Sequence, residues 1–138
     1  MREILFKGKT LKTHNWVYGG YYSMGGRTFI VVEFEVTTNW DIDDCYEKSM
    51  QRGYRLYEVD PNSVGQYTGQ VDQCGEKIFE GDIVYVPAED EYANVDWDEP
   101  TSRFILNFDC WCCCFDHFYG HELEVTGNTF DEGWFDEQ

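Results

Sequence analysis

Basic residues are scarce in this chain, and they become scarcer towards its C-terminus. The 138 residues include 10 lysines and arginines against 27 aspartates and glutamates, a formal net charge of −17 at pH 7. Residues 1–81 hold 12 acidic and 9 basic residues, whereas residues 82–138 hold 15 acidic residues and a single basic one, Arg103. Because such a field repels phosphate backbones, we expect no direct binding of nucleic acid by the second half.

Long apolar runs are also missing. No run reaches the roughly 18 residues that a membrane-spanning helix needs, and the apolar start Ile4-Leu5-Phe6 stops before it could form a secretion signal. We therefore expect no membrane partner and a cytoplasmic location. In that compartment the six cysteines are expected to be reduced thiols.

Motifs that would indicate an enzyme are absent from the sequence. It contains no Gly-Lys-Ser/Thr phosphate loop, no Gly-x-Ser-x-Gly elbow and no His-Glu-x-x-His helix. A cysteine nucleophile near His117 or His121 would have Asp109 and Asp116 close by, and negative charge raises the pKa of a thiol. We expect that the protein is not an enzyme.

Aromatic and β-branched residues, by contrast, are plentiful and occur in short runs between glycine turns. The chain has 10 Phe, 10 Tyr and 5 Trp residues, enough for a core without disulfides. Runs on either side of Ser23-Met24-Gly25-Gly26 predict a β-hairpin, and Gly69, Gly75 and Gly81 stand at turn positions, where glycine tolerates a positive φ. Residues 87–100 predict an acidic hairpin loop with a short strand around 93–97. The pattern therefore predicts a mainly β protein.

Two further segments carry a clear periodicity. Residues 41–52 follow a helical pattern, with aspartates first and Lys48 and Arg52 last, so we predict one short helix there; a solvated loop is the alternative. Residues 103–115 alternate, which predicts a single half-buried strand. Its core face would carry Phe104, Leu106, Phe108, Cys110, Cys112 and Cys114.

A resemblance to a known family rests on the segment from Val59 to Val86. It contains VDPNSVGQYTG, then a D-x-x-G turn and IFEGDIV, and the chain also has FKGK and WVYG near its start and EVTGN near its end. These segments closely resemble the YopX family of phage and prophage proteins, for which no biochemical activity is established. Lys7 stands where that family has Arg. Thr126 and Thr129 stand where it has Ile, so we expect the last strand to pack less tightly or to lie at a sheet edge.

The resemblance and the β pattern together imply a fold and a domain organisation. We expect a small β-barrel of the Src-homology-3 type in the C-terminal half, from Val64 to Phe130, and a β-hairpin unit before it. We expect two segments that pack as one unit. The first, 1–60, is β-rich and contains the short helix, and the second, 61–138, contains the barrel and an acidic tail. Open sheet edges would favour a homo-oligomer.

A cluster of cysteines and histidines leaves a metal-binding alternative open. Zinc prefers thiolate and imidazole ligands, but structural sites usually join two ligand pairs from separated segments. Here all the candidates fall within twelve positions, and small buried thiols are the commoner explanation. We favour no metal or other cofactor; the candidate zinc ligands are Cys112, Cys114, His117 and His121.

The function that we expect is that of a phage-encoded, non-enzymatic interaction protein in the cytoplasm of a bacterial host. Its acidic surface could imitate DNA and bind a basic host protein, although the same charge could serve only solubility. A structural role in phage assembly is a further alternative. The acidic residues that we assign to the interaction surface are Glu89, Asp90, Glu91, Asp96, Asp98 and Glu99.

Overall fold

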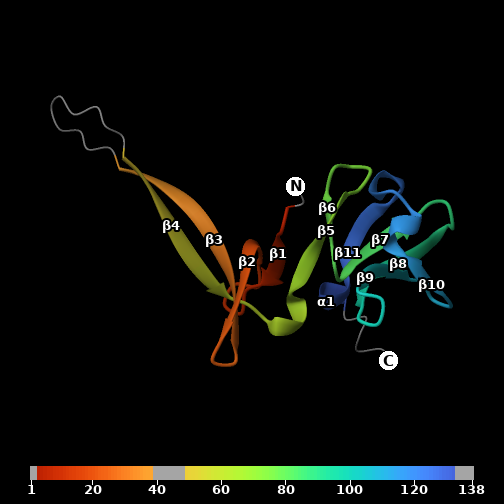
Figure 1. Cartoon of the computed structure of the whole chain (residues 1–138), viewed down its shortest axis with the longest axis horizontal. Coiled ribbons are helices and arrows are strands. Elements are labelled where there is room, and N and C mark those ends of the chain that lie inside the picture. Colours follow the sequence, from red (N-terminus) through yellow and green to blue (C-terminus); the bar gives the residue numbers. More distant parts are fainter. Residues whose placement is uncertain (1–2, 39–48, 133–138) are drawn as a thin grey trace.

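Two antiparallel sheets make up most of the molecule in the computed structural model, which describes residues 3–38 and 49–132 (Figure 1). The mainly β prediction is confirmed. Among the described residues no helix is long and apolar enough to cross a membrane. The strands are β1 (Phe6–Lys9), β2 (Trp16–Met24), β3 (Arg27–Thr38), β4 (Ser49–Glu58), β5 (Gly65–Val71), β6 (Lys77–Phe79), β7 (Asp82–Val86), β8 (Glu91–Asp98), β9 (Arg103–Asn107), β10 (Cys112–Cys114) and β11 (Glu124–Asn128).

The short helical elements lie between and after these strands. Three are single 3-10 turns, and the fourth is one α-helical turn that follows the last strand. Their bounds are η1 (Pro61–Ser63), η2 (Phe115–His117), η3 (Gly120–Glu122) and α1 (Thr129–Glu132).

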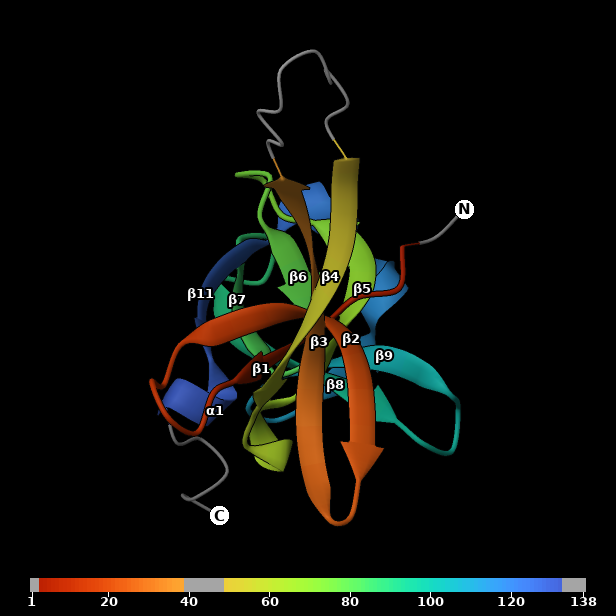
Figure 2. The ribbon, with the colours of Figure 1, turned by 90° about the vertical axis from the view of Figure 1, so that its left-hand side faces the viewer.

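The first sheet has the order β4-β3-β2-β1-β5-β6. The predicted hairpin is confirmed as β2 and β3, whose turn uses Gly25 and Gly26 at φ values of 61° and 77°. Strands β3 and β4 continue beyond the rest of the sheet and form an arm that points away from the second sheet (Figures 1 and 2). We call the three-stranded part β2-β3-β4 the arm sheet.

The predicted helix over 41–52 is wrong at its C-terminal end. Residues 49–52 belong to β4, where Met50 pairs with Thr37 and Arg52 with Glu35 of β3. Positions 41–48 lie outside the described residues. The partner strand explains the error: β3 offers β4 a row of backbone hydrogen bonds, and pairing of this kind overrides a weak local helical preference.

The second sheet has the order β10-β9-β8-β7-β11 and covers the main core. β11, the last of these strands along the chain, pairs with β7, the first of them, as expected in a small five-stranded barrel. Among the described residues no pairing joins β10 to β11, so these two strands are edges and the sheet is not closed there. Of the two outcomes expected for the last strand, the structure shows the edge position, because β11 pairs with β7 alone among the described strands. The core consists of Ile78, Val84, Val86, Ala93, Val95, Leu106, Phe108, Phe115, Phe118 and Leu123.

The single strand predicted over 103–115 is two strands. Residue Phe108 donates its backbone N–H to the carbonyl of Trp111 at 2.7 Å, and the chain turns back so that Cys112 pairs with Asn107. Alternation therefore holds up to Leu106 and Phe108, which are buried, and fails at Cys110 and Cys112, which are exposed. A tight turn inside an alternating run leaves no trace in the pattern of apolar residues.

The boundary between the two sheets does not coincide with residue 60. Strands β5 and β6 follow that residue but pair with the first sheet, through Phe6 opposite Gln66 and Lys7 opposite Gly65. The division of the chain into 1–60 and 61–138 stays a prediction.

Candidate functional site

An acidic groove lies beside β8 and β9, facing the start of α1 and the turn between β6 and β7. Its volume is about 1000 Å³. Four carboxylates and four side-chain amides line it, and no lysine or arginine of the described chain does. The carboxylates are those of Glu80, Glu91, Asp96 and Asp109, and the amides are those of Asn62, Asn94, Asn107 and Asn128.

Pairing of β8 with β9 positions the central polar groups of the groove. The register sets Asn94 opposite Asn107, and Asn107 donates from Nδ2 to Oδ2 of Asp96 at 3.2 Å. The backbone N–H of Trp97 also donates to Asp96. Asp96 is exposed, so its carboxylate is held in place while it still faces solvent.

Half-buried Glu80 is the electrostatically unfavourable member of the groove. Burial raises its pKa above the ordinary value, and the charge of nearby Asp96 raises it further, against the opposite effect of a backbone hydrogen bond from Gln66. Like charges held close to each other favour a cation that comes between them. The groove is therefore suited to a positively charged ligand.

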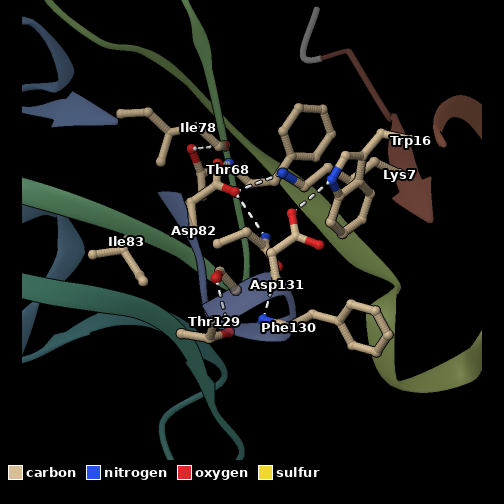
Figure 3. A network of polar contacts seen from close by, with 12 residues as sticks. Lys7, Trp16, Thr68, Ile78, Asp82, Ile83, Thr129, Phe130 and Asp131 are labelled. Atoms are coloured by element: carbon tan, nitrogen blue, oxygen red, sulfur yellow. Dashed lines mark hydrogen bonds and ion pairs between the residues drawn. The ribbon is translucent and has the colours of Figure 1, made fainter. Parts of the chain in front are cut away.

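A buried ion pair fixes the frame behind the groove (Figure 3). Lys7 of β1 donates from Nζ to Asp82 of β7 at 2.6 Å, and both side chains are almost fully buried. The other partners of Asp82 are the backbone N–H of Phe79 at 2.8 Å and the Nδ2 group of Asn128 at 3.1 Å. Lys7 also lies over the Trp16 ring, 4.6 Å from its centroid. This pair joins the two sheets.

The C-terminal turn is attached to the same frame. Thr129 donates to the carbonyl of Gly81 from its backbone N–H at 2.7 Å and from Oγ1 at 2.8 Å. Asp131 accepts from Lys9 and from the Trp16 indole N–H, and Figure 3 shows it beside the Lys7 network. Gly81 also donates to the carbonyl of Val95 at 2.7 Å, so three residues that line the groove, Thr129, Gly81 and Val95, are hydrogen-bonded in series.

The structure separates the six acidic residues that the sequence suggested as one surface. Only Glu91 and Asp96 line the groove. The others lie in or beside the turns at the two ends of β8: Asp90 accepts from the Tyr85 hydroxyl at 2.5 Å and Asp98 from Thr101 at 2.5 Å. The exposed Glu89 and Glu99 lie in the same two turns. Sequence reasoning missed Glu80 and Asp109, which come from other segments.

The cysteine and histidine candidates are not assembled into a metal site. Within 3–38 and 49–132, no group of three or more His, Cys, Asp and Glu side chains is placed to hold a metal ion. Cys114 accepts from Arg103 at 3.1 Å, while His117 and His121 pack against the rings of Phe118 and Tyr119. The remaining candidate, Cys112, is exposed in β10.

A thiol next to these candidates is also poorly suited to nucleophilic chemistry. Burial raises the pKa of Cys113, and the neighbouring Cys114, Cys112 and Glu89 raise it further. A raised pKa keeps the thiol protonated and therefore weakly nucleophilic at neutral pH.

Comparison with known proteins identifies the family to which the motifs pointed. The family model described as YopX protein matches residues 26–133, which is most of the chain. The match includes the Val59–Val86 segment and begins after β1 and β2, so Lys7 and Trp16 lie outside it. A search of curated proteins found no match.

Proposed function

This chain belongs to the YopX family, and we propose that it is a non-enzymatic interaction protein whose acidic groove binds a basic segment of another protein. The observation that supports the proposal most is the composition of the groove, with four carboxylates and no described cation in about 1000 Å³. The raised pKa of Glu80 supports it too, because a bound cation would relieve the repulsion there.

The finer proposal is that the partner is a nucleic-acid-binding protein of a bacterial host, and that the acidic surface takes the place of DNA. Two features support it: the chain carries a net charge of −17, and the groove offers both carboxylates and amides to arginine and lysine side chains. Charge complementarity of this kind steers association and is strongly weakened by salt.

A labelled basic peptide tests the groove directly. We would measure binding of a fluorescein-labelled deca-lysine peptide by anisotropy, at low and at physiological salt. A triple variant, Glu80→Gln, Glu91→Gln and Asp96→Asn, should weaken binding at least about tenfold, equivalent to about 1.4 kcal/mol. The matched control, Glu76→Gln, Glu99→Gln and Asp116→Asn, changes three exposed carboxylates outside the groove, so it alters the net charge equally.

The comparison of the two triple variants shows whether the peptide binds the groove or responds only to the net negative charge of the protein. If both weaken binding equally, the peptide responds to total charge alone and the groove is not the binding site.

For the DNA-mimic proposal, proteins captured from a bacterial lysate should be released by excess duplex DNA and by high salt. Partners that duplex DNA leaves bound would refute that finer proposal.

A further inference from the structure

The four carboxylates of the acidic groove are not compensated within the described chain. Among residues 3–38 and 49–132, the side-chain ion pairs all involve acidic residues that lie outside the groove. The function proposed above supplies the missing positive charge from a partner. The groups around the carboxylates then select between the two cations that a protein segment offers, lysine and arginine.

Hydrogen bonds fix the orientation of the carboxylate of Asp96 in the groove. Its Oδ1 atom accepts from the backbone N–H of Trp97 at 2.8 Å, and its Oδ2 atom accepts from Nδ2 of Asn107 at 3.2 Å. Both donors are neutral, so the negative charge stays available to a ligand. A carboxylate held in one plane matches the planar fork of a guanidinium, whereas an ammonium is a point charge that gains nothing from this orientation.

Asn94 adds an acceptor that has no partner in the described chain. It pairs with Asn107 across β8 and β9, and it lies two residues from Asp96 on the same face of β8. Its side chain is half-buried and forms no hydrogen bond with a described residue. An arginine side chain has five N–H donors and a lysine side chain three. An arginine that binds Asp96 therefore keeps donors for the amide oxygens of Asn94 and Asn107.

The surroundings of these acceptors also favour the more weakly hydrated cation. Burial is the largest cause of the raised pKa of Glu80, so water is partly excluded at that carboxylate. Apolar side chains, among them Val64, Phe108 and Phe130, line the same groove. An ammonium is strongly hydrated and loses more on entering such a site than a guanidinium, which also packs its flat face on apolar and aromatic groups.

We propose, on the basis of the function proposed above, that the groove prefers arginine to lysine and that its partner is an arginine-rich segment. Asp96 accepts the guanidinium fork, and the amide oxygens of Asn94 and Asn107 accept the remaining N–H groups. The carboxylates supply attraction to any cation, and the two amides supply the discrimination. Selectivity and affinity therefore depend on different side chains of one groove.

Three labelled peptides of equal charge test the preference: deca-arginine, deca-lysine and a decamer of asymmetric dimethylarginine. By fluorescence anisotropy at physiological salt, the wild type should bind deca-arginine at least about tenfold more tightly than deca-lysine. Dimethylation keeps the charge but blocks bidentate hydrogen bonding, so the third peptide should bind like deca-lysine. This comparison requires no variant. Equal binding of all three peptides would overturn the proposal.

An uncharged variant, Asn94→Ala with Asn107→Ala, tests the two amides, because it leaves all four carboxylates in place. Its preference for arginine should fall below about threefold, while its affinity for deca-lysine changes by less than about twofold. The matched control, Gln70→Ala with Gln73→Ala, removes two exposed amides outside the groove and should keep the full preference. Circular dichroism confirms that both variants are folded.

The triple charge variant of the groove separates this proposal from the function on which it rests. If that variant binds deca-arginine and deca-lysine as tightly as the wild type does, the groove is not the binding site and both proposals fail. If it weakens both peptides while the amide variant keeps the arginine preference, the groove binds cations without discrimination. That second result overturns the arginine preference and leaves the proposed function standing.

Discussion

Replacing Lys7 with methionine should destabilise the fold by about 3 kcal/mol, because it leaves the carboxylate of Asp82 buried without its cation. Loss of one partner of a buried ion pair typically costs 3–5 kcal/mol. We take the lower end because Asp82 keeps its hydrogen bonds from Phe79 and Asn128. Methionine fills much of the space of the lysine stem beside Trp16, so the variant removes charge with little loss of packing.

The loss is measured by urea denaturation, followed by tryptophan fluorescence and circular dichroism. For a chain of this length it corresponds to a melting temperature lower by about 10 °C. Lys12→Met is the matched control, because Lys12 is exposed, and it should change the stability by less than about 0.5 kcal/mol. The double variant Lys7→Met and Asp82→Asn should lose less stability than the sum of the two single variants. It removes both charges, so no buried charge is left without a partner. A Lys7→Met loss below about 1 kcal/mol, or fully additive losses, would refute the reasoning.

Two further predictions concern buried or half-buried carboxylates. Burial raises the pKa of Asp72, but hydrogen bonds from the backbone N–H groups of Val125, Glu76 and Cys74 lower it more, so the net pKa lies below its ordinary value. Asp72→Asn should therefore lower the free energy of unfolding by about 2 kcal/mol at pH 7. The difference in stability from the wild type should shrink as the pH falls through the folded-state pKa of Asp72. Urea titrations that give the same difference at every pH would contradict this. For Glu80 the sign is reversed: its raised pKa means that ionisation opposes folding, fully so above that pKa. Relative to Glu80→Gln, the wild type should gain stability as the pH falls through the raised pKa, and thermal melts between about pH 7.5 and 4.5 that show no such gain would count against the assigned environment.

Local sequence signals were reliable where a single turn or strand decides the structure. Glycines at 25, 26, 69, 75 and 81 all adopt the positive φ expected of turn positions. The strand predicted within the acidic loop is β8, and it is longer than its central residues suggested. These features depend on backbone sterics and on alternation over a few residues, which neighbouring residues alone determine.

The errors arose where backbone pairing with another strand decides the outcome. Residues 49–52 looked helical because their charges suit a helix end, but pairing with β3 made them a strand. The alternating run after Arg103 looked like one strand because a turn does not break its alternation, and the exposed Cys112 lies on the returning strand. In both cases backbone pairing with a neighbouring strand outweighed the local pattern.

The candidate groove shows the same division. Its acidic character could be read from the sequence, since the residues after Gly81 carry almost all of the net negative charge. Which carboxylates meet could not be read, because Glu80 and Asp109 come from turns 29 residues apart and reach one groove only through the pairing of β8 with its neighbours. No periodicity links positions whose separation depends on the topology of a sheet.

The sequence by itself determined the β character, the glycine turns, the YopX family and the uneven charge, because each depends on residue types or on short segments. The tertiary structure alone decided two features: the Lys7–Asp82 pair across 75 positions and the membership of the groove. The physical reason is that burial and electrostatic interaction depend on distance in space. That distance is defined only once the strands have paired in one register.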